Sequence, residues 1–223
     1  MGQGGKLVHL PAPPELPADL VECPDLQGAV ERALARREDV LGMRFQDAAL
    51  QEVQGGGVEF SGCVFQRCRF QGNDIKRLCL VDCVLDHCDL SNETFLRPSF
   101  QRVRLEHCRM TGIAFSEAAL MNLEITNCQM DFAALAETKL NRAALRHCRL
   151  RESAWDHVTL THLLLEDCDL TQTQWRYTPL KGIDLRGCEI SGWGIDIPDL
   201  QGAKVTTVQA LELCRLLRLE IVE

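Results

Sequence analysis

The residues of this chain that could do chemistry are mainly its cysteines and histidines. The sequence of 223 residues holds 12 cysteines and 6 histidines. Thiolates and imidazoles bind zinc and other transition metals, and thiols also form disulfides or act as nucleophiles. The sequence has no C-x-x-C pair of the kind found in zinc sites, and no nucleophile elbow, P-loop, dinucleotide-binding fingerprint or zincin motif. The cysteines therefore need an explanation other than catalysis.

Most of the cysteines follow a fixed spacing. Seven of them lie 20 residues apart in turn, namely Cys68, Cys88, Cys108, Cys128, Cys148, Cys168 and Cys188. Nine of the twelve occupy a kind of position that elsewhere holds Ala, Val, Thr or Ile. This exchange with small core residues indicates free, buried thiols that act as compact fillers. Disulfides or a metal are the alternative, because cysteines stacked above one another would lie within the usual Cα separation for a bridge.

The 20-residue spacing is a multiple of a shorter period of five. Every residue whose number is a multiple of five, from Phe60 to Ile190, is large and apolar, which makes 27 positions without an exception. A smaller residue, often Cys or Ala, stands two positions earlier. A period of five fits neither a helix nor a single strand, but it fits a backbone that turns a corner every five residues. Four such segments to a coil would place residues 20 apart above one another, about 4.8 Å apart, in a four-sided solenoid.

This pattern resembles the pentapeptide repeat proteins. The stretches GCVFQRCRFQG, DCVLDHCDLS and LEDCDLTQTQW carry the resemblance, which covers roughly residues 43–205. It implies an all-β fold, a right-handed quadrilateral parallel β-helix with short terminal capping helices. A scaffold of this kind does not by itself determine what the protein does.

We divide the chain into four parts within one domain. Residues 1–24 are rich in Pro and Gly and are predicted to be a flexible or loosely docked N-terminal segment. Residues 25–42 are predicted to form an N-terminal capping helix that begins after Asp25. Residues 43–205 form the repeat, and residues 206–223 a C-terminal helix and short strand that cap the solenoid or join two copies. Thr206 and Gln209 there make a capping box.

Three inward positions depart from the repeat. Asn73 and Glu93 occupy the small-residue position one coil apart, so the amide could donate a hydrogen bond to the carboxylate. The alternatives are a local bulge that turns Glu93 outward, or a functional pocket. Pro98 cannot donate a ladder hydrogen bond, and we expect the main irregularity of the solenoid near residues 93–98.

The histidines give a weaker signal than the cysteines. His87, His107 and His147 share one outward column with Asn127 and Asp167, so a metal could in principle bridge adjacent coils. Three ligands on a convex surface, two of them separated by two coils, would make a poor cage. We interpret them as exposed corner residues and predict no metal site, no cofactor and no catalytic residue. A filled core would also leave no concave substrate pocket, so we expect the protein not to be an enzyme.

The charge of the chain limits its partners and its location. A net charge of −8 and a pI near 5.3 argue against direct binding to nucleic acid. The sequence has no run of 18 apolar residues, which argues against a membrane span. Its first residues match neither a signal peptide nor the myristoylation pattern. We therefore expect a cytoplasmic protein.

Acidic residues gather on one side of the predicted solenoid. Residues 58–192 hold 18 acidic and 16 basic side chains, so the body as a whole is nearly neutral and no side matches the charge density of a phosphate ladder. The side centred on Leu85 and Leu105 is the most acidic. Its residues that we predict to bind a partner are Asp86, Glu106, Glu124, Glu166, Asp167 and Asp184. Elsewhere opposite charges alternate between coils, which favours register and solubility.

The last 24 residues, LQGAKVTTVQALELCRLLRLEIVE, carry a second resemblance. They are similar to the end of pentapeptide repeat proteins of the Qnr, MfpA and McbG type. That resemblance implies a homodimer joined tail to tail, which binds DNA gyrase or topoisomerase IV as a DNA mimic and protects it from quinolones. The predicted dimerisation residues form an apolar stripe, namely Ala210, Leu211, Leu213, Cys214 and Leu217. An interaction scaffold with an unrelated partner is the alternative.

Overall fold

A residue with left-handed backbone recurs at every fifth position of the chain. In the computed structural model, which describes residues 10–218, each of the 29 residues spaced by five from Gly42 to Gly182 has a φ between 48° and 84°. None of them is Val, Ile or Thr, because β-branched side chains are strongly disfavoured in this conformation. Eleven are Asn, Asp or His, which adopt it more readily. Each such residue redirects the chain, and this explains the period of five.

Short strands lie between these corners, and five strands of eight residues run through one. The strands are β1 (Val21–Glu22), β2 (Val40–Leu41), β3 (Met43–Gln46), β4 (Ala49–Gln51), β5 (Gln54–Gly56), β6 (Glu59–Ser61), β7 (Val64–Gln66), β8 (Arg69–Gln71), β9 (Asp74–Lys76), β10 (Cys79–Asp86), β11 (Thr94–Leu96), β12 (Ser99–Glu106), β13 (Ala114–Ser116), β14 (Ala119–Thr126), β15 (Ala134–Ala136), β16 (Lys139–Arg146), β17 (Ala154–Asp156), β18 (Thr159–Glu166), β19 (Gln174–Arg176) and β20 (Gly194–Ile195). The helices are α1 (Leu26–Arg36) and α2 (Thr207–Leu213), with 3₁₀ turns η1 (Ile197–Leu200) and η2 (Cys214–Leu217).

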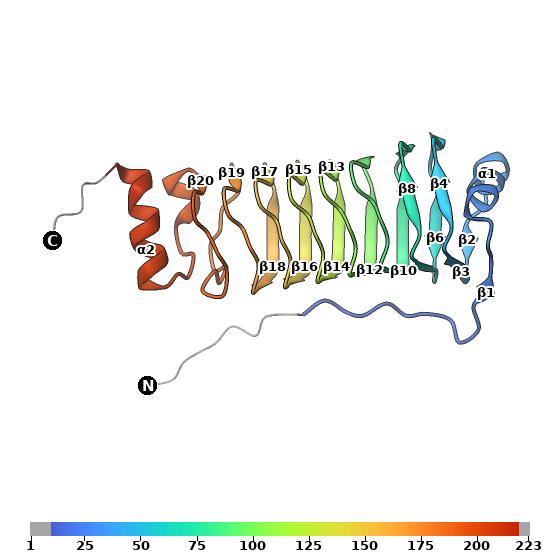
Figure 1. Cartoon of the computed structure of the whole chain (residues 1–223), viewed down its shortest axis with the longest axis horizontal. Coiled ribbons are helices and arrows are strands. Elements are labelled where there is room, and N and C mark those ends of the chain that lie inside the picture. Colours follow the sequence, from blue (N-terminus) through green and yellow to red (C-terminus); the bar gives the residue numbers. More distant parts are fainter. Residues whose placement is uncertain (1–9, 219–223) are drawn as a thin grey trace.

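The coils stack in parallel register along the long axis of the molecule (Figure 1). Residues 20 apart pair, as Leu85 does with Leu105. We name the four faces after their central residues in one coil. The Leu80 and Leu85 faces together carry a ten-stranded sheet. The Phe95 face carries a six-stranded sheet and, in the first coils, the pair β5–β9, whereas the Leu90 face carries the pair β4–β8 and is held by single bridges after it. This arrangement, of about nine turns, confirms the predicted four-sided parallel β-helix.

The inside of the solenoid is filled by the two predicted sets of side chains. Of the 27 large apolar residues at multiples of five, 26 are buried and Leu160 is partly buried. The chain is free of disulfides, since all twelve cysteines lie in the described part as free thiols. The Sγ atom of Cys68 lies 3.4 Å from the carbonyl oxygen of Phe45. The hydroxyl oxygen of Thr138 likewise lies 3.4 Å from the carbonyl oxygen of Phe115. A small donor at this position therefore satisfies a buried carbonyl of the preceding coil.

The N-terminal end of the solenoid is covered by helix α1. Asp25 caps it, accepting a hydrogen bond from the Gly28 N–H at 2.7 Å, and the helix buries Leu26 and Val30 against the first coil. The helix ends at Arg36, earlier than the predicted boundary at residue 42. The reason is that Arg37 is left-handed, with a φ of 55°, and the chain enters β2 soon afterwards.

Residues 10–22 form an extended strap along the solenoid (Figure 1). They belong to the segment 1–24 that the sequence predicted to be flexible or loosely docked, and the structure shows this part docked. The Ala12 N–H donates to the Asn122 side-chain oxygen at 3.2 Å, and the Glu15 N–H donates to the Asp82 carboxylate at 2.9 Å. Strand β1 then pairs with β3. The backbone donors of the strap thus find acceptors on the corner between the Leu80 and Leu85 faces.

The C-terminal end is covered by α2. Thr206 and Gln209 form the predicted capping box. The Gln209 side chain is buried and donates to the carbonyl oxygens of Leu185 and Cys188, each at 2.7 Å, which anchors the helix on the last coil. The terminal strand predicted from Leu219 and Ile221 lies outside the described residues. Among residues 10–218, no helix is both long and apolar enough to cross a membrane.

The predicted irregularity lies at Glu93. The Asn73 amide nitrogen donates to the Glu93 carboxylate at 3.2 Å, and Glu93 is buried facing inward instead of being turned out by a bulge. The Phe95 face is divided there, since β9 and β11 belong to different sheets.

Pro98, which was expected to distort its coil, leaves the ladder intact. Ser99 N donates to Leu78 O and Ala119 N donates to Pro98 O, both at 2.9 Å. The equivalent N–H of Val158 points to the Thr178 hydroxyl at 3.0 Å. At this position the amide therefore faces a side chain of the next coil, and a proline removes no bond of the sheet.

Candidate functional site

The predicted partner-binding residues follow the Leu85 face and its corner. Asp86 and Glu106 are neighbours in register on β10 and β12, and Arg104 stands beside Glu124 in the next pair of strands. Glu166 lies at the end of β18, next to Arg146 on β16. The repeat therefore brings the predicted acidic residues onto one side of the molecule, with arginines among them.

Ion pairs neutralise much of this acidic surface. The Arg146 guanidinium contacts Glu124 at 2.6 Å and Glu166 at 3.1 Å. The Arg186 guanidinium contacts Asp184 at 2.8 Å, and its hydrogen bonds hold the pKa of that carboxyl below its usual range. Each of these three carboxylates thus has a guanidinium beside it. The face consequently presents alternating charges instead of a continuous negative stripe.

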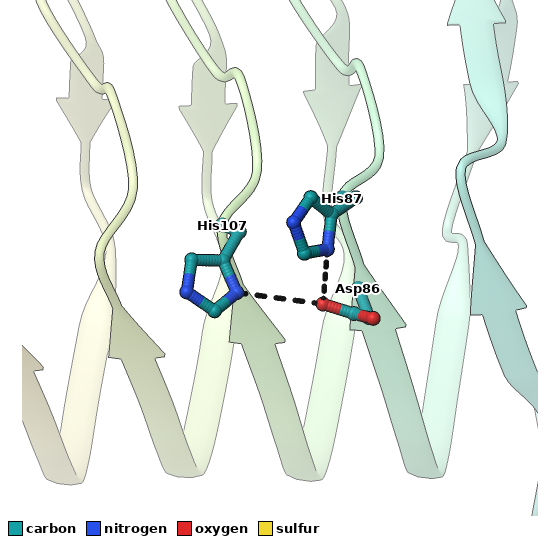
Figure 2. Close-up of side chains that lie close together, drawn as sticks. All are labelled: Asp86, His87 and His107. Atoms are coloured by element: carbon teal, nitrogen blue, oxygen red, sulfur yellow. Dashed lines mark hydrogen bonds and ion pairs between the residues drawn. The ribbon is translucent and has the colours of Figure 1, made fainter.

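Asp86 has histidines as neighbours instead of arginine. Its Oδ1 atom lies 2.7 Å from Nδ1 of His87 and 3.6 Å from Nδ1 of His107, and both rings turn toward it (Figure 2). The two imidazoles are stacked, with 4.6 Å between their centroids. The sequence grouped His87 and His107 with His147, Asn127 and Asp167. The structure separates that column into this cluster and a His147–Asp167 pair at 3.6 Å.

Sequence reasoning missed the role of Asp86 in this cluster. The signal was present, because Asp86 directly precedes His87 and the next histidine follows 20 residues later. Strand side chains alternate between the two sides of a sheet, so Asp86 and the corner residue His87 were assigned to separate columns. At the corner the backbone of His87 is left-handed, with a φ of 54°, and its ring swings back toward Asp86.

A shallow groove of about 400 Å³ surrounds the cluster. Leu16 of the strap closes one side, and Arg104 and Glu106 line the floor with the histidines. Among the described residues, Nε of Arg104 is a buried nitrogen without a hydrogen-bond acceptor. Arg44 also lines the groove, which therefore combines two imidazoles, two carboxylates and two guanidiniums at the surface of the solenoid.

The predicted dimerisation residues divide between two sides of the C-terminal helix and its 3₁₀ extension. Leu211 and Leu217 are about half exposed, at 52% and 50%. Ala210 is also exposed, whereas Cys214 is partly buried and Leu213 packs against the core of the solenoid. Val208, at 76% exposure, belongs to the outer apolar surface although the sequence did not single it out.

The repeated part of the chain matches a known protein family. The model of the family described as a pentapeptide repeat region matches residues 78–155 and 98–175. No curated protein sequence matches the chain. Among solved structures the chain is similar to QnrB1, a plasmid-mediated fluoroquinolone resistance protein, with 21% identity over 81% of this chain and 97% of that chain and a TM-score of 0.46.

A second similar structure comes from a cyanobacterium. It is HetL, a pentapeptide repeat protein involved in heterocyst differentiation regulation from Nostoc sp. strain PCC 7120. Its identity to this chain is 14%, over 79% of this chain and 93% of that chain, with a TM-score of 0.27.

Proposed function

The chain is a pentapeptide repeat protein, and from that premise we propose that it acts by recognising the surface of another protein, without catalysis. The observation that carries this proposal is the filled interior of the solenoid. The cavity inside the core is about 20 Å³, smaller than a small-molecule ligand requires, and the outward side chains form regular columns on a rigid rod. Such a rod offers an extended surface to a partner, while its interior has no room for a substrate and the groove around Asp86 is shallow.

The partner that we propose is a type II topoisomerase, either DNA gyrase or topoisomerase IV. The support is the resemblance of residues 200–223 to the end of the Qnr, MfpA and McbG type of protein. In that type, a rod of two solenoids occupies the site of DNA and protects the enzyme from quinolones. The acidic residues of the Leu85 face, which run along the rod, would meet the cationic surface of the enzyme.

We propose that the rod is a homodimer joined through α2. The outer surface of the helix and its 3₁₀ extension exposes Val208, Leu211 and Leu217. Helix α2 lies at the end of the rod (Figure 1), where a second copy would bury these side chains and double the length of the rod. Gln209 and Leu213 hold the helix on its own solenoid, so the helix both caps and presents this surface.

The test is the effect of the purified protein on gyrase. We expect it to change DNA supercoiling and to restore supercoiling in the presence of a quinolone. A variant with Glu124→Lys and Glu166→Lys should be weaker, because it reverses charge on the Leu85 face. Glu117→Lys is the matched control, since Glu117 is also paired with an arginine, Arg97 at 2.8 Å, but lies away from that face.

A protein partner unrelated to topoisomerases is the second candidate. The observation that favours it is the neutralisation of the acidic face by Arg146 and Arg186, because a DNA mimic needs dense uncompensated negative charge. No effect on gyrase or topoisomerase IV at high micromolar protein would exclude the first candidate. The fold and the role in surface recognition would remain.

A further inference from the structure

We propose that Asp86, His87 and His107 form a binding site for a divalent transition-metal ion of the zinc class. One ligand atom from each residue lies within 4.8 Å of the other two, and no other group of three His, Cys, Asp or Glu side chains among residues 10–218 meets in this way. Two imidazole nitrogens and a carboxylate oxygen are ligands that zinc prefers in proteins. A third protein ligand is what distinguishes this cluster from an ordinary pair of His and Asp.

The ligand atoms already face one another. The Nδ1 atoms of His87 and His107 both point at Oδ1 of Asp86, at 2.7 and 3.6 Å (Figure 2). Ligands about 2.1 Å from a tetrahedral zinc ion are separated by roughly 3.5 Å, a value close to these two distances. The two imidazoles are stacked, so at least one ring must turn out of the stack for both nitrogens to direct a lone pair at the same ion. All three side chains are partly exposed, which leaves a path for an ion from solvent.

The scaffold holds these ligands on rigid elements. Asp86 ends β10, and β10 is paired with β12, whose last residue Glu106 directly precedes His107. Both histidines are corner residues with a φ of 54°, and hydrogen bonds fix both corners, since the His87 N–H donates to Glu106 O at 2.9 Å. Binding an ion would therefore require little ordering of the backbone.

The preference of left-handed corners for histidine does not by itself explain why three possible metal ligands meet at Asp86, His87 and His107. Histidine suits a left-handed corner, and His157 shows the same geometry, with Nδ1 2.9 Å from Oδ1 of the preceding Asp156. Tyr177 occupies the corresponding corner of the next coil. It has no metal-binding nitrogen, and the centroids of its ring and of the His157 ring are 4.4 Å apart. The chain thus contains a natural version of the same corner that lacks the third ligand.

The surroundings supply a second set of contacts. The Nε2 atom of His107 lies 3.4 Å from the Asn127 side-chain nitrogen, and reversing this amide would turn an oxygen toward an Nε2–H group. Metal-bound histidines usually donate their other ring N–H to such an oxygen. Glu106 lines the same groove and offers a further carboxylate, with the guanidiniums of Arg44 and Arg104 beside it. Three protein ligands leave a fourth position for water or for a side chain of a partner.

The experiment is calorimetric titration of the full-length protein with Zn²⁺ in a buffer without chelators. We expect one Zn²⁺ per chain, bound at least about tenfold more weakly by Asp86→Asn and by His107→Tyr. His107→Tyr recreates the stacking of His157 on Tyr177 and should preserve the fold, which thermal unfolding checks. His157→Tyr is the matched control, and its affinity for Zn²⁺ should equal that of the original protein.

Spectroscopy with Co²⁺ separates this site from the cysteines. Co²⁺ bound by imidazole and carboxylate shows d–d absorption without the thiolate charge-transfer band that a cysteine ligand produces. We expect the d–d bands and expect them to disappear in the Asp86→Asn, His107→Tyr double variant. A thiolate band, binding that survives the double variant, or no binding at millimolar Zn²⁺ would each overturn the proposal.

Discussion

At the scale of the residue, the left-handed corner governs which side chains the repeat accepts. From Gly42 to Gly182 every fifth residue adopts this conformation, and most of these residues are exposed, whereas Asp82 and Asn122 are buried where the strap contacts them. A left-handed backbone costs roughly 1–2 kcal/mol for an ordinary L-residue, less for Asn or Asp, and nothing for Gly. Phe132 and Tyr177 are bulky corner residues that are more than half exposed. Because their rings are only partly buried, apolar burial offsets less of the energy of their left-handed backbone.

Replacing Phe132 by Asn should therefore stabilise the protein. Phe132 has a φ of 58° and is 56% exposed, so the gain in backbone energy should exceed the loss of apolar burial, by about 0.5–1 kcal/mol. The measurement is the free energy of unfolding in urea. Asn92→Phe, at a corner with a φ of 60°, should give the opposite sign. Equal stability of both variants and the original would show that the corner conformation does not select its residues.

The buried pair of Asn73 and Glu93 makes a second prediction at this scale. The Asn73 side chain donates to Leu50 O at 2.9 Å and to the Glu93 carboxylate at 3.2 Å, while its oxygen accepts from the Val53 N–H at 3.1 Å. Asn73→Ala removes these three hydrogen bonds and leaves the buried Glu93 side chain only the backbone N–H of residue 73, at 3.4 Å, so we expect a loss of about 1–3 kcal/mol. Combining it with Glu93→Ile should restore part of this loss, because Ile113 fills the same position one coil later. Strictly additive losses in the urea unfolding of the four proteins would contradict the coupling.

At the scale of the element, the strap is tied to the solenoid by Asp82. This carboxylate accepts the Glu15 N–H at 2.9 Å and forms a two-pronged ion pair with Arg102, both contacts at 2.6 Å. The Arg102 guanidinium holds the pKa of Asp82 below its usual range, and the Glu15 N–H acts in the same direction against the effect of burial. One side chain therefore joins two coils and the strap.

The contribution of Asp82 to stability should depend on pH. Its pKa is lower in the folded protein than in the unfolded chain, so its stabilising effect is fully present above the unfolded value of about 3.9. The effect is lost as the pH falls through the lower folded pKa. We expect Asp82→Asn to reduce the free energy of urea unfolding by about 1–3 kcal/mol at pH 7 and by less as the pH falls below 4. A difference that stays constant down to the acid range would show that the charge of Asp82 is not what matters.

At the scale of the whole molecule, the repeat produces a rod whose ends differ. Helix α1 covers the N-terminal coil and leaves Leu26 and Val30 buried, whereas the C-terminal helix exposes Val208 and Leu211. Solenoid ends must be covered because an open coil exposes unpaired backbone groups and core side chains. The C-terminal cap performs this task with Gln209 and still presents an apolar surface.

This asymmetry predicts a dimer through the C-terminal end. Val208→Glu with Leu211→Glu should convert the dimer to a monomer, because two carboxylates would be buried without partners in the interface. Both side chains are exposed in the single chain, so the variant should remain folded. Light scattering coupled to size-exclusion chromatography measures the mass. Gln201→Glu, an exposed residue near the same end, is the control, and a monomeric original protein would refute the prediction.

The amino-acid sequence by itself determined the coil, its core and its free cysteines. Each pentapeptide repeats one local rule, and the same two positions are buried in every coil, so Leu85 or Cys108 could be placed without any knowledge of its neighbours. The same rule located the irregularity at Glu93. It also predicted a distortion at Pro98, which the structure does not show. That prediction was wrong because the spacing of residues does not reveal whether the amide at this position takes part in the sheet.

Only the tertiary structure decided how exposed side chains of different coils meet. Arg146 reaches Glu124 and Glu166, the strap reaches Asp82, and Asp86 lies between His87 and His107. The physical reason is that the repeat specifies the separation of the Cα atoms, whereas these contacts depend on the rotation of long side chains about a left-handed corner. The partition of the C-terminal stripe, with Leu213 turned inward and Leu211 outward, likewise depended on where Gln209 docks on the last coil.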